Sequence, residues 1–214
     1  MSHSATVTKR PYTMLGRATS AAATRHRILK SAVTLFLARG YDSVTLAVVA
    51  DQAGVSLQTV LRKFGSKDEL FVAASRMHQR EELALRAVPA GDIRAVVGVL
   101  AGRYESTGAT MMHFIALEDR IPSVAVVLTQ ARQAHRRWLA QAFAPALPNR
   151  GDSSYAVRLA QLFGATELYV WVSWRRRLGL SRATAERAMA DTLTALVASW
   201  AREAPGRQRR KRNG

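Results

Sequence analysis

Residues 53–67 read AGVSLQTVLRKFGSK, a stretch that places turn-forming residues between short apolar pairs. Gly54 indicates the end of a helix, because only glycine enters a left-handed turn without a steric cost. Ser56 is a natural N-cap for a new helix over residues 57–64, and Gly65 ends that helix. The stretch therefore predicts a tight turn followed by a short helix whose first side chains project outward.

The flanking segments complete a helix-turn-helix pattern. Thr45 is a natural N-cap for a helix over residues 46–53. Before it, we predict a helix over residues 20–39. The apolar stripe of that helix comprises Ile28, Ala32, Leu35 and Phe36. After the turn, Ser66 and Glu69 form a capping box that begins a longer helix, to about residue 87.

The second half of the chain also predicts helices, after a break marked by Pro89 and Gly91. These helices span residues 92–105, 108–119, 123–143, 152–178 and 181–203. No segment alternates with period two for long, so we expect an all-α fold of about nine helices. The expected regions are a disordered basic arm (1–19), a helix-turn-helix DNA-binding domain (20–87), a helical effector-binding and dimerisation domain (88–204) and a basic tail (205–214).

Positive charge is the strongest signal in the composition, since the 214 residues carry a formal net charge of +17. Cations concentrate at both ends of the chain, which favours a polyanionic partner and sequence-independent attraction to nucleic acid. The N-terminal arm, with Arg10, Arg17, Arg25 and Arg27, either enters a minor groove or is a solvated tail. An arginine-rich composition is also what a GC-rich genome produces, so charge alone leaves the partner open.

The sequence also bounds the location of the protein. No stretch of about 18 uncharged apolar residues is present, so we expect no membrane span. Cysteine is absent, which excludes disulfides and thiolate metal sites and fits a reducing compartment. The N-terminal cations precede no apolar segment, so we expect no secretory signal. These features favour the cytoplasm.

Residues 24–73 resemble the N-terminal DNA-binding domain of the TetR family of bacterial transcriptional repressors. The residues that carry the resemblance are Ile28, Leu29, Ala32, Leu35, Phe36, Gly40, Tyr41, Thr45, Val49, Ala50, Ala53, Gly54, Val55, Ser56, Thr59, Phe64, Ser66, Lys67 and Leu70. The resemblance implies a nucleoid-associated bacterial regulator that binds a near-palindromic double-stranded operator as a homodimer and is released by a small-molecule effector. The second half resembles the family only in being helical.

By this resemblance, residues 57–63 belong to the recognition helix. Gln58 and Thr59 are the candidates for base contacts, since a glutamine amide pairs with adenine through two hydrogen bonds. Arg62 and Lys63 are candidates for base or backbone contacts. The full set of candidate DNA-binding residues is Thr45, Ser56, Leu57, Gln58, Thr59, Leu61, Arg62, Lys63 and Lys67.

Several of these positions have a second interpretation. Thr45, Ser56 and Lys67 lie where the family contacts phosphates, although threonine and serine are helix caps in any helical protein. Leu61 stands where the family usually has tyrosine, so it keeps only the apolar part of that contact. Residues 65–67, GSK, resemble the end of a Walker A motif, but the upstream glycine-rich run and the preceding strand are missing.

The segment over residues 157–174 is apolar or small on nearly every face, so it is expected to be buried on two sides. In a chain of this size, the second side is expected to be another subunit. The resemblance implies that the last two helices form a four-helix bundle with their two-fold mates. The predicted interface residues are Leu168, Trp171, Val172, Leu193, Leu196 and Trp200.

The resemblance also implies an effector pocket, and the second half offers aromatic, methionine and acidic side chains for it. The candidates are Tyr104, Met111, Met112, Phe114, Glu118, Trp138, Phe163 and Glu167. Each of them suits an ordinary core or surface position better than a ligand contact, so the sequence leaves the pocket open. An effector would act by stabilising a conformer with lower affinity for DNA.

No enzymatic role is expected. His113 and Glu118 are five residues apart, and His135 lies among arginines, so neither a zinc-protease helix nor a catalytic triad is present. We therefore predict no catalytic residue, no cofactor and no metal site. The alternative function is a non-specific architectural DNA- or RNA-binding protein driven by the basic ends.

Overall fold

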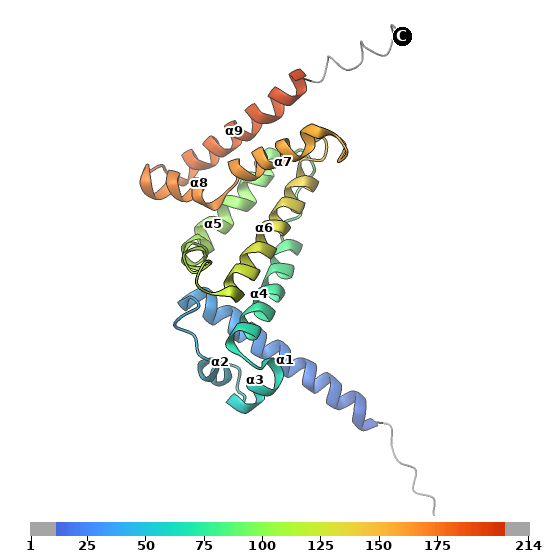
Figure 1. The fold of residues 1–214 in the computed structure, drawn as a ribbon, viewed down its shortest axis with the longest axis vertical. Coiled ribbons are helices and arrows are strands. Elements are labelled where there is room, and N and C mark those ends of the chain that lie inside the picture. Colours follow the sequence, from blue (N-terminus) through green and yellow to red (C-terminus); the bar gives the residue numbers. More distant parts are fainter. Residues whose placement is uncertain (1–11, 204–214) are drawn as a thin grey trace, which may run out of the picture. The chain divides into compact units, whose positions relative to one another are not determined.

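The computed structural model describes residues 12–203, which form α-helices, one π-helical turn and loops, with no strand (Figure 1). The all-α prediction is therefore confirmed. The chain divides into two compact units, with the boundary after His78. The assignment of functional domains to residues 20–87 and 88–204 stays a prediction, and the basic tail over 205–214 lies outside the described residues. None of the described helices is both long and apolar enough to cross a lipid bilayer.

The first unit contains α1 (Tyr12–Arg39), α2 (Leu46–Gln52), α3 (Leu57–Phe64) and the start of α4 (Lys67–Ala84). Its core includes the predicted stripe of α1, since Ile28, Ala32, Leu35 and Phe36 are all buried. Phe36, Tyr41 and Phe71 form an aromatic cluster, in which the Phe71 ring meets both others edge to face at 4.9 and 5.1 Å between centroids. This cluster joins the end of α1 to α4 and fixes the frame that carries α2 and α3.

Helix α1 begins at Tyr12, eight residues before the predicted start at residue 20. The prediction of a disordered arm over residues 1–19 is therefore wrong for residues 12–19, while residues 1–11 lie outside the described part of the chain. We based the predicted start on apolar periodicity, which this segment lacks. Alanine, leucine and methionine have high intrinsic helix propensity, and the sequence of residues 12–19 contains all three residue types.

The second unit contains α5 (Ile93–Ala116), α6 (Pro122–Ala142), α7 (Ser153–Ala165), α8 (Leu168–Val172), the π-helical turn η1 (Ser173–Arg177) and α9 (Arg182–Glu203). Its core is continuous and aromatic-rich, with Trp171, Phe143, Leu162 and Met189 each at most 2% exposed. Helix α5 packs on α6, α8 and α9, and α7 packs on α6 and α9. The unit is thus a helical bundle built around α5.

Helix α5 is continuous, whereas the sequence predicted two helices separated at Gly108. Gly108 is buried inside the helix, and a Cβ atom placed there would lie 3.3 Å from Leu168 Cδ1. The glycine therefore allows the close approach of α8 rather than ending a helix.

The single helix predicted over residues 152–178 is instead divided into α7, α8 and η1. The first break lies at Thr166 and Glu167, without glycine or proline. The Thr166 hydroxyl donates to the Leu162 carbonyl at 2.8 Å, and the Thr166 carbonyl accepts from Tyr104 Oη at 2.5 Å. Side chains on other helices therefore hold this junction, which local sequence signals do not record.

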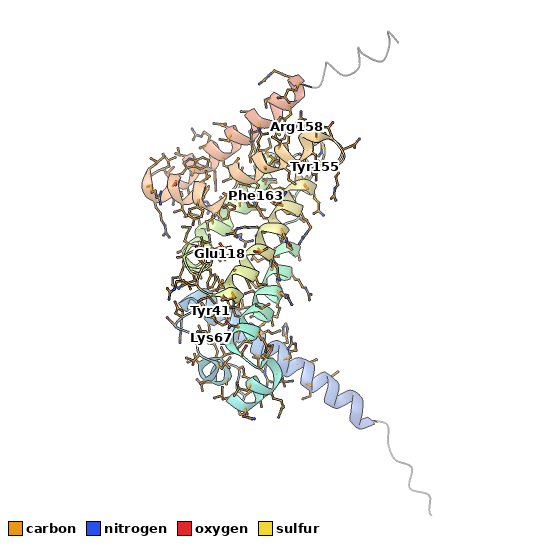
Figure 2. The ribbon with its side chains drawn as sticks, in the orientation of Figure 1. Tyr41, Lys67, Glu118, Tyr155, Arg158 and Phe163 are labelled. Atoms are coloured by element: carbon orange, nitrogen blue, oxygen red, sulfur yellow. The ribbon has the colours of Figure 1, made fainter. Side chains whose placement is uncertain are left out.

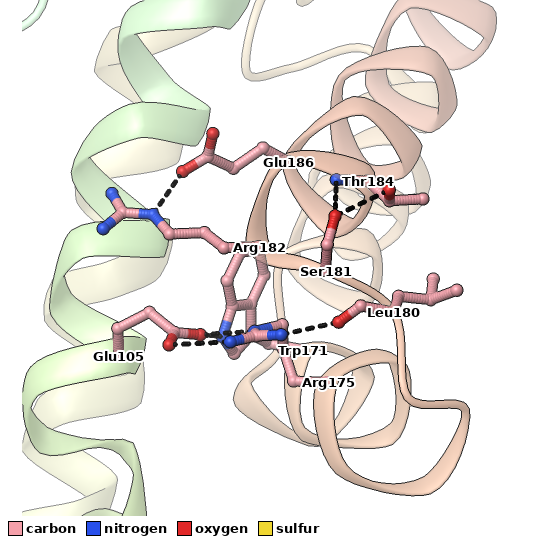
Figure 3. Close-up of polar contacts among 8 residues, drawn as sticks. All are labelled: Glu105, Trp171, Arg175, Leu180, Ser181, Arg182, Thr184 and Glu186. Atoms are coloured by element: carbon pink, nitrogen blue, oxygen red, sulfur yellow. Dashed lines mark hydrogen bonds and ion pairs between the residues drawn. The ribbon is translucent and has the colours of Figure 1, made fainter.

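A polar cluster holds α8 and η1 against α5 (Figure 3). Glu105 of α5 accepts from Trp171 Nε1 at 2.9 Å and from Arg175 Nε at 2.7 Å, and Arg175 also donates to the Leu180 carbonyl. The Arg175 guanidinium lowers the pKa of the Glu105 carboxyl from its ordinary value. The cluster fixes the turn of the chain between α8 and α9.

Candidate functional sites

The turn between α2 and α3 has the predicted local structure. Thr45 Oγ1 accepts from the Val48 amide at 3.3 Å and caps α2. Gly54 has a φ of +63°, which favours glycine, and Ser56 Oγ accepts from the Thr59 amide at 3.2 Å to cap α3. Each of these two hydrogen bonds joins residues three positions apart in the chain, so the caps are formed by the local sequence.

One side of α3 is exposed, and we call it the α3 face. It consists of Leu57, Gln58, Leu61 and Arg62, which recur at the i, i+1, i+4 and i+5 positions of the helix. Leu57 is 43% exposed and Leu61 is 36% exposed, although both are large apolar residues. The opposite side holds Val60 and Phe64, which are buried in the first unit. The helix is therefore fixed by its inner side and presents an amide, a guanidinium and two leucines to solvent.

Two predicted contact residues, Thr59 and Lys63, lie beside the α3 face and are half-buried. The Thr59 hydroxyl is 2.9 Å from the Ser56 hydroxyl. Lys63 Nζ donates to the Ala21 carbonyl of α1 at 3.2 Å. Both side chains therefore have intramolecular partners that any contact with DNA would have to replace or extend.

Lys67 lies at the start of α4, next to Tyr41 (Figure 2). Its Nζ atom is 4.2 Å from the centre of the Tyr41 ring and donates to the Asp42 carbonyl at 3.4 Å. Partial burial lowers the pKa of the Lys67 ammonium from its ordinary value. The Tyr41 hydroxyl in turn donates to Asp68. Lys67 is thus positioned on an aromatic ring at a helix N-terminus, a location that suits a phosphate.

Half of the predicted capping box is present at the same N-terminus. Ser66 Oγ accepts from the Glu69 amide at 3.1 Å, as predicted. The Ser66 amide donates to the Phe64 carbonyl at 2.8 Å, because Gly65 turns the chain back at a φ of +72°. The Ser66 amide, which Glu69 was expected to bind, therefore donates its hydrogen bond within the turn instead.

The second unit contains a cavity of about 110 Å³ between α5, α6 and the α7–α8 junction. Four predicted pocket residues line it, namely Tyr104, Met111, Phe163 and Glu167. The other four, Met112, Phe114, Glu118 and Trp138, do not line it. Trp138 is buried and donates from Nε1 to the Arg86 carbonyl at 2.8 Å, and Glu118 receives two hydrogen bonds from Arg132 at 2.5 Å.

Sequence reasoning missed the basic side chains that line this cavity, which are Arg86, Arg103, Arg132 and His135. Arginines are ordinarily surface residues, and the chain is rich in them, so their number carried no signal. Helical spacing offered a partial signal, since Arg132 and His135 share a side of α6 with the buried Leu128.

Burial determines the protonation of two groups at the cavity. It raises the pKa of the Tyr104 phenol, which stays neutral and donates to the Thr166 carbonyl. Burial also lowers the pKa of His135 to about 4, so the imidazole is neutral at pH 7. His135 Nε2 lies 3.0 Å from Thr166 Oγ1, whose hydrogen already goes to the Leu162 carbonyl. We therefore assign the His135 proton to Nε2, which leaves Nδ1 as an acceptor.

Most predicted dimer-interface residues are buried within the chain itself. Leu168, Trp171, Leu193 and Trp200 are at most 8% exposed, whereas Val172 and Leu196 are half-buried. Side chains buried within one chain have little surface to offer a second copy. The exposed side of α7 instead carries mostly small or apolar residues, namely Ala156, Val157, Ala160 and Gly164, together with the polar Gln161.

Comparison with known sequences shows that the helix-turn-helix segment matches a family model. Residues 28–74 match the model described as bacterial regulatory proteins, tetR family. The HTH-type transcriptional regulator TcmR of Streptomyces glaucescens is 34% identical over 114 residues. That alignment covers 47% of this chain and 50% of TcmR, so the chain spans half the length of this curated relative.

Solved structures share the fold at low sequence identity. A tetR-family transcriptional regulator from Streptomyces coelicolor has a TM-score of 0.67 and 19% identity, over 85% of this chain and 83% of that one. A protein from Saccharomonospora viridis solved in complex with choline has a TM-score of 0.61 and 15% identity, over 81% of this chain and 96% of that one. The shared fold thus extends well beyond the residues that match the family model.

Proposed function

We propose that this chain, whose residues 28–74 match the model of the tetR family of bacterial regulatory proteins, is a DNA-binding transcriptional regulator, most simply a cytoplasmic repressor. The family consists of regulators rather than enzymes, in agreement with the sequence prediction. The observation that carries the proposal is the α3 face, where Leu57, Gln58, Leu61 and Arg62 project together from a capped helix after a glycine turn. The dimensions of an α-helix fit the major groove of DNA.

The chemistry of the α3 face suits base edges. The Gln58 amide pairs with adenine through two hydrogen bonds, and the Arg62 guanidinium pairs with guanine in the same way. The two leucine side chains suit thymine methyl groups, which gives their exposure a function. Thr45, Ser56 and Lys67 are proposed to contact phosphates, where they position the helix without reading sequence.

A dimer is proposed to double this contact. Two copies of α3 related by two-fold symmetry would lie roughly 34–36 Å apart, one turn of DNA, so the operator is expected to be a near-palindrome. We propose that the small apolar side of α7 replaces Leu168, Trp171, Leu193 and Trp200 as the principal interface, with Val172 and Leu196 at its edge. Replacing Ala160 by Glu should convert dimers to monomers in light scattering, whereas Ala183→Glu, at the exposed start of α9, should not.

The cavity of the second unit is the proposed effector site. Support comes from its lining of apolar and hydrogen-bonding side chains and from the choline complex of the similarly folded protein. A ligand that binds the conformer with weak DNA affinity more tightly than the conformer with strong DNA affinity would shift the protein toward the first. The difference between the two ligand affinities sets how far the affinity for the operator falls.

The test compares binding of the protein to its own upstream intergenic DNA with binding to a random duplex of equal length at about 0.15 M salt. A specific regulator is expected to prefer its operator by roughly 10³ or more. The rival function, a non-specific architectural protein, predicts a ratio near one and a steep salt dependence on both duplexes. A ratio near one would therefore contradict the proposal.

A further inference from the structure

Arg86 is a buried cation in the turn between α4 and α5. It is 6% exposed, lines the cavity, and its guanidinium carbon lies 5.8 Å from the centre of the Trp138 ring. Among the described residues, no acceptor lies within hydrogen-bond reach of Arg86 Nε. A buried N–H donor without an acceptor is unfavourable, since its desolvation is not offset by a hydrogen bond. Among the described residues, Arg86 is therefore the arginine of the lining that makes no ion pair.

The other arginines of the cavity are already paired. Arg132 binds the Glu118 carboxylate through two hydrogen bonds of 2.5 Å, and Arg103 lies 3.6 Å from Glu82. Glu167 is the acidic residue of the lining, but no ion pair within residues 12–203 joins it to Arg86. The positive charge of Arg86 is thus left for a group that the described chain does not supply.

The rest of the lining is chiefly apolar. It includes Leu100, Met111, Ile115, Leu128 and Phe163. The cavity of about 110 Å³ is smaller than the ordinary range of ligand pockets, roughly 300 to 1,000 Å³. A ligand that fits it must be small and largely apolar.

We propose that this cavity binds a small apolar carboxylic acid, whose carboxylate pairs with the Arg86 guanidinium and whose body packs against Met111, Leu128 and Phe163. A guanidinium edge and a carboxylate can form two parallel charge-assisted hydrogen bonds. A cationic ligand would instead add charge next to Arg86. A phosphate would require more cations than Arg86, since the other arginines are paired. The inference deepens the effector proposal by giving the chemical class of the ligand.

The test uses the full chain and matched ligands of equal shape: benzoate, benzamide and benzylamine, together with hexanoate and hexanamide. Binding is measured by calorimetry and by the shift of the unfolding temperature. The acids are expected to bind at least 10-fold more tightly than their amides, and benzylamine more weakly than either. The proposal is overturned if neither acid binds, or if an amide or the amine binds as tightly as its acid.

Variants then locate the site. Arg86→Met is expected to reduce benzoate affinity at least 10-fold, and Arg86→Lys to retain part of it through the charge. Arg94→Met, which removes an exposed arginine from the first turn of α5, is the control and should leave the affinity unchanged. Equal benzoate affinity in wild type and Arg86→Met contradicts the proposal. Should Arg86→Met fail to fold by circular dichroism, Arg86→Gln gives the same comparison with a neutral polar side chain.

The outcomes separate this inference from the proposed function. Ligand binding is measured without DNA, and operator selectivity is measured without ligand. If the protein prefers its operator but binds neither acid, the proposed ligand class is wrong and the proposed regulator function stands. If the protein binds the acids through Arg86 but shows no preference for its operator, the proposed regulator function is wrong and the ligand assignment stands.

Discussion

The α3 face and the cavity of the second unit combine apolar and cationic side chains in opposite ways. The α3 face exposes two leucines to solvent, and the cavity buries an arginine whose Nε has no partner within the described chain. Each arrangement is unfavourable in the isolated protein and becomes favourable when a partner covers it. The partners differ accordingly: a broad polyanion with apolar methyl groups for α3, and a small anion for the cavity.

The two sites also differ in how many elements build them. The α3 face comes from residues 57–62 of one helix, whose caps lie next to it in sequence. The cavity needs α5, α6, the α7–α8 junction and the turn at Arg86 to meet. A substitution on the α3 face is therefore expected to change binding with little effect on folding, whereas one near the cavity is expected to change both.

The largest predicted effect is a difference in the free energy of unfolding between two leucine-to-alanine variants. Leu162→Ala in the core of the second unit should lower the free energy of unfolding by about 2–5 kcal/mol, since Leu162 is fully buried. Leu61→Ala on the α3 face should change it by less than about 0.5 kcal/mol, while it weakens operator binding. Urea unfolding followed by circular dichroism measures both. A similar loss in the two variants would show that the α3 face is part of a core.

The stability of the second unit should depend on pH through His135. Its folded pKa of about 4 lies below the ordinary value near 6.5, so the unfolded chain binds more protons between these values. Stability should therefore fall as the pH falls from about 6.5 to 4, by on the order of 3 kcal/mol. Tryptophan fluorescence reports this unit, because all four tryptophans lie in it.

The matched control for this pH dependence is a second histidine of the same unit. His135→Gln should flatten the dependence of stability on pH, and His113→Gln, at an exposed position of α5, should leave it as in the wild type. An unchanged slope in His135→Gln would mean that other groups cause the pH dependence. The first unit contains no tryptophan, so its unfolding does not contribute directly to the tryptophan fluorescence.

A smaller effect is expected when Gln58 and Thr59 are both replaced by alanine. The loss should be about 1–3 kcal/mol for the operator and close to zero for random DNA, because Gln58 is proposed to contact bases. Lys67→Ala should weaken binding to both duplexes alike, since a phosphate contact carries no sequence information. Fluorescence anisotropy titrations measure these affinities. If the double variant lost equal affinity for both duplexes, residues other than Gln58 and Thr59 would have to contact the bases.

The sequence predicted those features that short-range contacts determine. Ser56 caps α3 through an amide three residues away, and Gly54 supplies the positive φ of the turn, so both can be recognised without tertiary information. Gly108 carries the same local signal as a helix end. Its role depends on Leu168, which is 60 residues away in the chain, and the predicted break at Gly108 was therefore wrong.

The cavity was predictable only in part for the same reason. Tyr104, Met111, Phe163 and Glu167 were candidates by residue type, and they line the cavity because α5 and the α7–α8 junction meet there. Arg86 gave no signal, since its burial depends on the packing of Trp138, 52 residues further along. Thr166 and its helix break were missed because the hydrogen bond from Tyr104 crosses between helices.

The central claim is that the α3 face enters DNA, and the leucine methyl NMR spectrum of the full chain, titrated with operator duplex, tests it most directly. We predict that the methyl signals of Leu57 and Leu61 shift most, while those of the buried Leu162 in the second unit stay near their free positions. Leu61→Ala and Leu57→Ala assign the two signals. Unchanged Leu57 and Leu61 signals at saturating operator would contradict the account.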